Sequence, residues 1–292
     1  MEKIIIHRTV VFSSPDLLGG EAVVVVMPVP PTPELMRLLR VVFSGASSES
    51  ANAAWCFCWR ERETLAVRCY AGGRMIDFCG HGLLACANVW YRRDGQCPTL
   101  RSASADYRCA LRHNQLWLST PRVRCEIAEP PRASVRWFDS PAQRGAVAGG
   151  AQGYRILEWQ AGTDLANLRP NLDAIVRDET RAVIATQAFT AAQRREHGWD
   201  FSLRYFAPQY GVAEDSATGS ANAVLADYWT GRGLRNAAEG SATWRAKQCS
   251  PRGGAIMSRL HGSLVDIGGH FHVIETTSIR LKTAGSYAGV GA

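Results

Sequence analysis

The chain has 292 residues, of which 46% are hydrophobic, so it can bury one large core or two moderate ones. Its formal net charge is +7, yet its arginines are scattered among acids and form no basic run with interleaved aromatics, which argues against nucleic-acid binding. The longest apolar run, residues 22–27, is far too short to cross a bilayer, so no membrane partner is expected either.

The first part of the chain is predicted to be rich in strands. Apolar runs predict strands at residues 4–12, 22–27, 51–59, 65–70, 107–111 and 116–119. The first two of these strands are expected to form a hairpin, because proline and glycine residues punctuate the segment between them. Periodic apolar spacing predicts helices at residues 33–42 and 82–92.

The second part of the chain repeats this mixture. Strands are predicted at residues 154–159, 182–186, 203–208, 255–260, 264–267 and 270–275. Helices are predicted at residues 165–176 and 220–231, and the glycine-rich residues 145–153 are interpreted as a linker or an exposed loop. Many strands with one prominent helix per half fit neither a solenoid nor a regular alternation of strands and helices.

A polar turn that contains a glycine leads into the helix predicted at residues 220–231. Thr218 or Ser220 is expected to cap this helix, and Gly219 allows a ligand to approach the backbone. A helix N-terminus carries unpaired N–H groups and about half a positive charge, which suits a carboxylate or a phosphate. Asp215 lies just outside this positive end, where an acidic side chain can act on a bound ligand.

A second turn of the same design, Cys79-Gly80-His81-Gly82, precedes the helix at residues 82–92. The two turns lie about half a chain apart, which suggests two similar halves that each present a helix N-terminus. If these two ends face each other, one anion can lie between them, with Cys79 and Asp215 on either side. Two-base proton transfer requires such an arrangement, with a carbon acid held between two proton-transfer groups.

Nine cysteines are dispersed along the chain, several of them in apolar runs. An odd number of scattered cysteines in a long chain favours reduced, mostly buried thiols over a disulfide framework, and hence a cytoplasmic protein. No second C-x-x-C segment and no H-x-x-x-H pattern completes a set of zinc ligands, so no metal is expected. No secretion signal is expected at the N-terminus.

Several segments resemble signatures of the phenazine-biosynthesis PhzF-like family, whose members are relatives of diaminopimelate epimerase. Besides the opening hairpin, they are residues 79–82 (CGHG), 204–208 (RYFAP), 214–221 (EDSATGSA) and 248–254 (QCSPRGG). The resemblance implies an α+β fold of two similar domains, each a curved mixed sheet wrapped around a central helix, with a cleft between them. The expected domains are residues 1–121 and 122–280, with residues 281–292 as a tail able to return to the first half.

The resemblance also implies an isomerase or epimerase that removes a proton from a carbon atom and returns it elsewhere or to the other face, without a cofactor. The family's acidic residue corresponds to Asp215, and its carboxylate-binding residues correspond to Gly80, His81, Thr218, Gly219 and Ser220. The expected substrate is a small carboxylic or amino acid, and the expected assembly is a homodimer.

One position departs from the family pattern. The family's catalytic glutamate begins a strand, and the gap-free match places Asn52 there, whose neutral amide cannot abstract a proton. Glu49, three residues earlier, is one substitute. Cys79 is another, because the diaminopimelate epimerase relatives carry a catalytic cysteine there and a helix start lowers the pKa of a thiol. Cys79 can equally be a small buried hydrophobe, and Asp215 an acid that only stabilises a helix end.

Three hypotheses for the function compete on these grounds. The first is an isomerase of a small carboxylic acid that uses Asp215 with Cys79, with Glu49 or with a water held by Asn52. The second is a small-carboxylate-binding protein on the same scaffold, without turnover because the base is lost at Asn52. The third is an interaction module with a vestigial cleft, which would bind no small carboxylate.

Overall fold

The structure, a computed structural model, describes residues 2–44, 53–71, 74–234 and 243–281. Glu49 and Asn52, the two residues considered for the position of the family's glutamate, lie outside these described residues. The tail beyond residue 281 lies outside them too.

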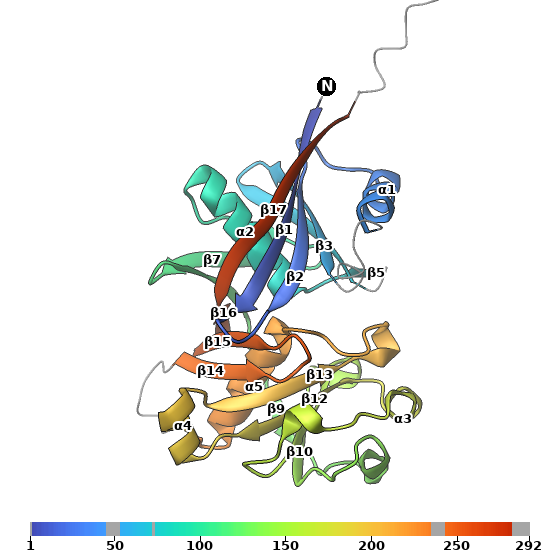
Figure 1. Cartoon of the computed structure of the whole chain (residues 1–292), viewed down its shortest axis with the longest axis vertical. Coiled ribbons are helices and arrows are strands. Elements are labelled where there is room, and N and C mark those ends of the chain that lie inside the picture. The colour runs from blue at the N-terminus through green and yellow to red at the C-terminus, as the bar shows by residue number, and fades with distance from the viewer. Residues whose placement is uncertain (1, 45–52, 72–73, 235–242, 282–292) are drawn as a thin grey trace, which may run out of the picture.

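Figure 1 shows two lobes stacked along the long axis of the molecule. The elements up to residue 121 are β1 (Glu2–Ser13), β2 (Gly20–Val26), α1 (Pro33–Ser44), β3 (Ala54–Glu61), β4 (Thr64–Ala71), β5 (Arg74–Ile76), α2 (Gly80–Asp94), β6 (Thr99–Arg101), β7 (Asp106–Arg112) and β8 (Gln115–Pro121). The elements after it are β9 (Cys125–Ile127), β10 (Arg144–Ala148), β11 (Tyr154–Glu158), the 3₁₀ turn η4 (Leu165–Asn167), α3 (Leu172–Asp178), β12 (Ala182–Ala188), α4 (Ala191–His197), β13 (Phe201–Phe206), the 3₁₀ turn η5 (Pro208–Tyr210), α5 (Gly219–Gly231), β14 (Thr243–Gln248), β15 (Gly254–His261), β16 (Leu264–Gly268) and β17 (His270–Leu281).

The strands form one ladder with the same pattern in both directions from its centre. The centre is the antiparallel pair of β8 and β16. Outward through β7, β6, β4, β3, β2, β1 and β17, the pairings run antiparallel twice, then parallel, antiparallel, parallel and antiparallel twice. Outward through β15, β14, β13, β12, β11, β10 and β9, they run in the identical order. The chain therefore consists of two halves of the same topology, as expected from the two matching turns.

The last strand of each half crosses to the other half. β9 follows β8 in the chain but pairs with β10. β17 follows β16 but pairs with β1 over its whole length, from Glu2 opposite Leu281 to Ser13 opposite His270 (Figure 1). This exchange joins the two lobes through main-chain hydrogen bonds. The division of the chain into domains at residue 121 stays a prediction.

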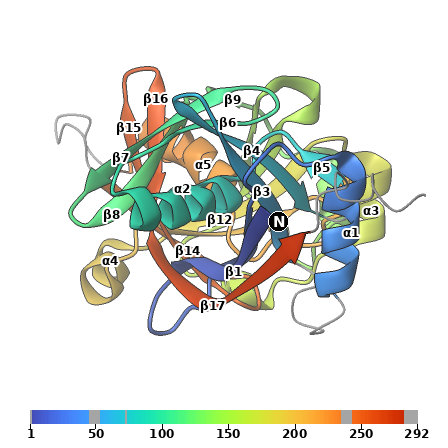
Figure 2. The ribbon, with the colours of Figure 1, turned by 90° about the horizontal axis from the view of Figure 1, so that it is seen from above.

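The two central helices share one hydrophobic core. Figure 2 shows α2 enclosed by strands of its own half, and α5 holds the matching position in the other half. Leu83 and Leu84 of α2 belong to the same buried cluster as Val224 and Leu225 of α5. Every residue of α5 from Ala221 to Trp229 is buried, and all of them except Asn222 and Asp227 are apolar or aromatic, as expected for an interior helix.

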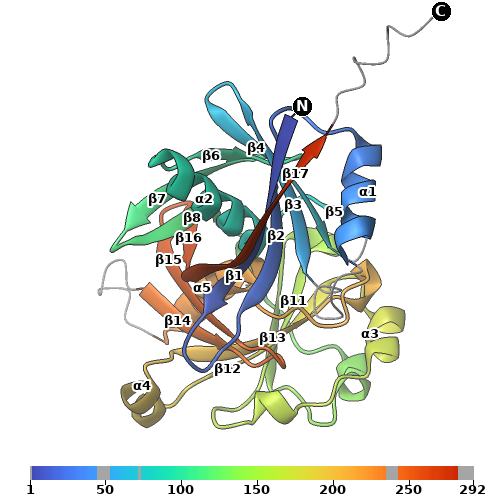
Figure 3. The same ribbon diagram turned by 45° about the horizontal axis from the view of Figure 1, so that its top comes forward.

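Further helices cover the outer faces of the sheets. Met36 and Leu39 of α1 pack against Trp55 and Phe57 of β3, on the side of the sheet away from α2 (Figure 3). In the second half, Ile175 of α3 packs into a separate outer cluster with aromatic and aliphatic side chains of the sheet. Each half therefore has a helix inside its curved sheet and a smaller layer outside it.

Two segments of the second half differ from the sequence interpretation. The glycine-rich stretch expected to be a linker or an exposed loop contains β10, in which Ala146 and Ala148 are buried and which pairs with both β9 and β11. The small residues of β10 mark tight packing between strands, whereas residues 149–152 form the exposed loop that was expected. β14 was not predicted, because Trp244 and Ala246 face the core while charged residues alternate with them.

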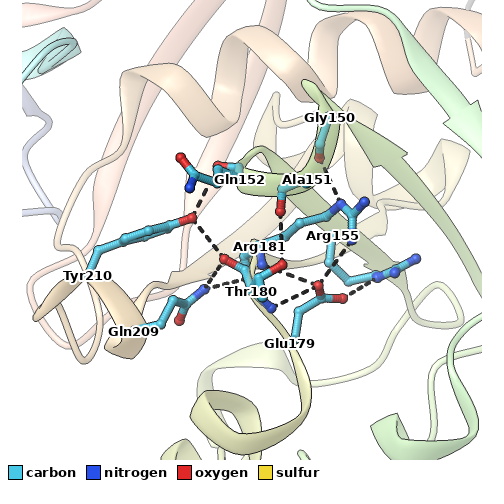
Figure 4. Close-up of polar contacts among 9 residues, drawn as sticks. All are labelled: Gly150, Ala151, Gln152, Arg155, Glu179, Thr180, Arg181, Gln209 and Tyr210. Atoms are coloured by element: carbon cyan, nitrogen blue, oxygen red, sulfur yellow. Dashed lines mark hydrogen bonds and ion pairs between the residues drawn. The ribbon is translucent and has the colours of Figure 1, made fainter.

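A polar network fixes η5, the turn that precedes the acidic signature (Figure 4). The Glu179 carboxylate accepts hydrogen bonds from Arg155 Nε at 2.7 Å and from Arg181 Nη1 at 3.2 Å. Burial alone would raise the pKa of Glu179, but these arginines hold it below its ordinary value. Tyr210 of η5 donates its hydroxyl to the Thr180 carbonyl at 2.8 Å, which attaches the turn to this network.

Candidate active site

The N-termini of the two central helices touch each other. A Cβ atom added to Gly80 would lie 3.1 Å from Gly219 Cα, and one added to Gly219 would lie 3.4 Å from Gly80 Cα. Both positions also face Ile267 Cδ1, at 3.1 and 2.8 Å. The predicted convergence of two helix starts is therefore confirmed, and only glycine leaves room for this approach of two backbones.

Neither of these helix starts is capped by a side chain within the described part of the chain. Cys79 and Thr218 occupy the N-cap positions of α2 and α5 without a capping hydrogen bond, whereas Asn171 caps α3 and Thr190 caps α4. The prediction that Thr218 or Ser220 caps α5 is wrong, because the Thr218 hydroxyl donates to Asp215 Oδ2 at 2.7 Å. The first-turn N–H groups of both helices are thus left for an anion.

Gln248 holds the turn before α5. Its side chain is fully buried, its Oε1 accepts from the Thr218 N–H at 2.7 Å, and its Nε2 donates to the Asp215 carbonyl at 2.6 Å. The Asp215 N–H in turn donates to the Tyr205 carbonyl at 3.1 Å. The backbone of Asp215 is therefore fixed on both sides, while its carboxylate stays partly exposed and is oriented by Thr218.

Glu214, the neighbour of Asp215, is bound to a buried arginine. Arg204 Nε and Nη2 donate to the two oxygens of Glu214 at 2.7 and 2.8 Å, and Arg204 Nη1 donates to the carbonyls of Leu165 and Leu168. Arg204 is 6% exposed. The two adjacent acids thus have different roles, since Glu214 anchors the turn and Asp215 faces the helix starts.

Cys79 and His81 form a buried pair at the start of α2. The Cys79 Sγ lies 3.8 Å from His81 Nδ1 and 3.9 Å from Nε2. Burial alone would lower the pKa of His81, but the charges of Cys79 and Asp215 outweigh it and raise this pKa to about 9. The thiols of Cys56 and Cys69, followed by the charge of His81, hold the pKa of Cys79 well below its ordinary value. Both shifts favour a thiolate on Cys79 beside an imidazolium on His81.

Other thiols lie directly beneath Cys79. Cys56 and Cys69 stand opposite each other on β3 and β4, with their Sγ atoms 3.1 Å apart. A Cβ atom added to Gly82 would overlap Cys56 Sγ and would lie 3.0 Å from Cys79 Sγ. Hydrogen bonds to Cys56 and Cys79, together with burial, raise the pKa of Cys69 well above its ordinary value. Within this cluster the pKa values of Cys56 and Cys69 are raised and that of Cys79 is lowered, which favours the charge on Cys79.

Sequence reasoning missed residues that surround these groups. A Cβ atom added to Gly20 would lie 3.6 Å from His81 Cδ2, so the start of β2 also borders the site. Burial, followed by the charges of Tyr154 and Asp215, raises the pKa of Tyr205 well above its ordinary value. Alternation along β13 was a usable signal for Tyr205, but nothing in the sequence indicated which face of that strand meets Asp215.

The structure brings together most of the expected site residues. Cys79, Gly80, His81, Asp215, Thr218, Gly219 and Ser220 lie on the two helix starts and the turns before them. Their catalytic and binding roles stay predictions, as do those of Glu49 and Asn52, which the structure does not describe.

No group of three or more His, Cys, Asp or Glu side chains in the described part of the chain is arranged to hold a metal ion. All nine cysteines lie within it, and all are free. No helix of this part is long and apolar enough to span a membrane.

Comparisons with known proteins agree with this architecture. A family model described as phenazine biosynthesis-like protein matches residues 48–271. A relative described as an uncharacterised isomerase of Pseudomonas aeruginosa is 29% identical over 280 residues, which cover 94% of this chain and 98% of that protein.

Solved structures show the same fold at low identity. A PhzF-family phenazine biosynthesis protein of Enterococcus faecalis superposes with a TM-score of 0.79 at 22% identity, over 96% of this chain and 100% of that one. A hydroxyproline epimerase of Agrobacterium vitis, solved with bound trans-4-hydroxy-L-proline, superposes with a TM-score of 0.59 at 11% identity, over 97% and 94% of the two chains. The expected diaminopimelate epimerase-like fold is thereby confirmed.

Proposed function

Because this chain belongs to the phenazine biosynthesis-like protein family, we propose that it is an isomerase or epimerase that moves a proton on a small carboxylic or amino acid without a cofactor. The observation that carries the proposal is the contact between the uncapped starts of α2 and α5, with ionisable side chains of both halves next to it. The name of the Pseudomonas aeruginosa relative and the epimerase fold support the same class of reaction.

The substrate carboxylate binds where the two helices meet. Each helix start offers unpaired N–H groups and about half a positive charge, so their contact at Gly80 and Gly219 doubles the attraction for one anion. His81 adds a positive charge on one side, and the hydroxyl of Ser220 lies in the first turn of α5 on the other. These groups hold the carboxylate and direct the adjacent carbon towards the side chains of the two turns.

Cys79 and Asp215 are the proton-transfer groups in this proposal. The thiolate of Cys79, stabilised by its neighbours, takes a proton from the substrate carbon, and His81 balances the charge that this step moves. Asp215 belongs to the other half and delivers or removes the second proton, with Thr218 orienting its carboxylate. Glu49 and a water held by Asn52 stay predicted alternatives to Cys79.

A binding protein without turnover is not favoured by any described residue. That hypothesis rested on Asn52, which lies outside the described residues. A carboxylate binder would need the uncapped helix starts, but it would have no use for the charged pair of Cys79 and His81 beside them.

Assembly and location are part of the proposal. A homodimer is proposed from the family resemblance, and light scattering with the purified chain tests it. A cytoplasmic location is proposed from the cysteines, because Cys56, Cys58, Cys69, Cys79 and Cys86 are buried and free.

Deuterium exchange at carbon tests the proposed reaction. D- and L-amino acids and small hydroxy acids are incubated with the protein in D₂O, and wash-in at the carbon next to the carboxylate is followed by mass spectrometry. We expect exchange with at least one compound, and its loss in Asp215→Asn and in Cys79→Ala. The exposed Asp106, paired with Arg101 on the surface, provides the matched control Asp106→Asn, which should keep the rate. Exchange that is unchanged in both site variants would refute the assignment.

A further inference from the structure

A row of polar side chains crosses three strands on the outer face of the second half. Gln187 of β12 stands opposite Ser202 of β13, and Ser202 stands opposite Lys247 of β14. Directly opposed residues point to the same face of a sheet, so the three side chains are neighbours. Residues next to them in sequence, such as Leu203 and Ala246, belong to the core around α5, so this row faces away from that helix.

Two members of the row are buried without the hydrogen bonds they can make. Gln187 is 5% exposed and Ser202 is 0% exposed. Neither Gln187 Oε1 nor Ser202 Oγ has a hydrogen-bond partner among the described residues. Gln187 Nε2 donates to the Thr163 carbonyl, which fixes the amide and leaves its oxygen as an unused acceptor. Folded proteins rarely leave buried polar atoms unpaired unless a water, an ion or a ligand completes them.

Lys247 adds a cation to this row. It forms no ion pair with any described residue, and it is half-buried. Lys247 stands opposite Ser202 in the ladder, so the two side chains share this face of the sheet. Arg252, the other cation nearby, is already paired with Glu21 at 3.0 Å.

A cavity of about 370 Å³ lies over the row. Its walls are the segment at residues 162–166 and the turn at residues 249–253, and Gln187, Ser202 and Lys247 line it. The cavity falls in the range of small-molecule sites and exceeds the volume of a single water many times over. Gln248, the next residue of β14, also borders the cavity, but its side-chain amide points to the opposite face of the sheet, where it holds Thr218.

We propose that the Gln187–Ser202–Lys247 row is a second binding site, for a small hydroxy-carboxylate. The carboxylate lies against the Lys247 ammonium and accepts a hydrogen bond from Ser202, and the hydroxyl of the ligand donates to Gln187 Oε1. Gln187 and Lys247, the two ends of the row, are two strand spacings apart, about 10 Å in total. The reach of their side chains shortens the remaining gap to about the length of a four-carbon acid.

Calorimetry with L-malate as the probe tests this proposal. We expect binding to the wild-type protein and weaker binding of succinate, which lacks the hydroxyl. Lys247→Met should weaken L-malate binding by about tenfold to a hundredfold, the effect of losing one charge-assisted hydrogen bond. Lys3→Met, which removes an exposed lysine of β1, is the matched control and should leave binding unchanged.

Two further variants keep the test independent of folding and of the candidate active site. Ser202→Ala removes a buried hydroxyl that has no partner in the described structure, so it should raise the melting temperature and lower the affinity for L-malate. His81→Ala alters the helix starts and should leave this affinity unchanged. The proposal is overturned if L-malate does not bind, if Lys247→Met and Ser202→Ala both bind it normally, if His81→Ala alone abolishes binding, or if a crystal soaked in L-malate shows only ordered waters over the row.

Discussion

The turns before α2 and α5 have the same backbone design and opposite chemistry. Both place a glycine at a helix start, and the two glycines touch. The turn before α2 carries the Cys79 thiol beside the His81 imidazole and rests on further thiols. The turn before α5 carries a carboxylate and is held by hydrogen bonds of Gln248 and Arg204. The repeated topology supplies one anion site, and the unlike side chains make its two sides inequivalent.

This inequivalence divides the tasks between the halves. The sulfur side is soft, since the described contacts of Cys79 with its neighbours are few and long. The carboxylate side is rigid, since Asp215, Thr218 and Glu214 are each fixed by short hydrogen bonds. Substitutions on the α5 side should therefore affect both the stability of the fold and the rate of the reaction. Substitutions on the α2 side should affect mainly the ionisation of Cys79.

The largest effect is expected on the rigid side, from Arg204→Met. This change leaves Glu214 and the carbonyls of Leu165 and Leu168 without their buried partner, which costs about 3–5 kcal/mol of unfolding free energy. Denaturant unfolding measures it. The matched control is Arg101→Met, whose pair with Asp106 is exposed on both sides and should contribute little to stability. Equal losses in the two variants would contradict the anchoring role of Glu214.

The contact between the halves is tested by Gly80→Ala. The added Cβ lies 3.1 Å from Gly219 Cα, so the helix starts must move apart. This overpacking should cost about 1–3 kcal/mol of unfolding free energy, and the displaced N–H groups should bind a carboxylate more weakly. Gly231→Ala is the control, because its Cβ would meet nothing within 4 Å at the other end of α5. Equal affinities for Gly80→Ala and the wild type would show that the glycine contact does not shape the anion site.

The clamp on Asp215 is tested by Gln248→Met. The Thr218 N–H then loses its acceptor in a buried position, which costs about 1–3 kcal/mol, and the rate of deuterium exchange should fall as Asp215 loses its fixed orientation. The corresponding change beneath Cys79 is Cys69→Ala, which removes a neutral thiol and should cost about 1 kcal/mol. A larger loss for Cys69→Ala than for Gln248→Met would reverse the assignment of the rigid and soft sides.

The last prediction concerns ionisation, because His81→Ala removes a charge that lowers the pKa of Cys79 and should therefore raise this pKa. The pKa of His81 is raised to about 9 in the folded protein, so the charged imidazole stabilises the fold fully below its unfolded value of about 6.5 and loses this effect as the pH rises through 9. The thiolate absorbance in the ultraviolet, with Cys79→Ser as the blank, follows the ionisation. An exposed histidine, His270, provides the control His270→Ala. If Cys79 titrates in His81→Ala as it does in the wild type, the imidazole does not lower the pKa of Cys79.

Local patterns predicted the elements that position the site. A glycine-containing turn before an uninterrupted apolar run is sufficient to place the starts of α2 and α5, because both signals are local. The pairing of β17 with β1 was beyond such reasoning, since it joins residues more than 250 positions apart and depends on the register of the whole ladder.

The chemistry of the site was only partly predictable for the same reason. Cys79 and Asp215 were identified by their places in the turns. The thiols beneath Cys79 were not, because they meet through the register that sets Cys56 opposite Cys69. The clamp by Gln248 was missed because β14 itself was missed, and the anchoring of Glu214 depends on the burial of Arg204.

A crystal structure of the Asp215→Asn variant with a bound carboxylate, chosen from the compounds that the wild-type protein exchanges, tests the central claim most directly. If the two helix starts share one anion, the carboxylate oxygens of the bound compound should lie within hydrogen-bond distance of N–H groups from both α2 and α5. The adjacent carbon should then lie between Cys79 and residue 215. A carboxylate bound to one helix alone, or bound elsewhere in the molecule, would contradict the account.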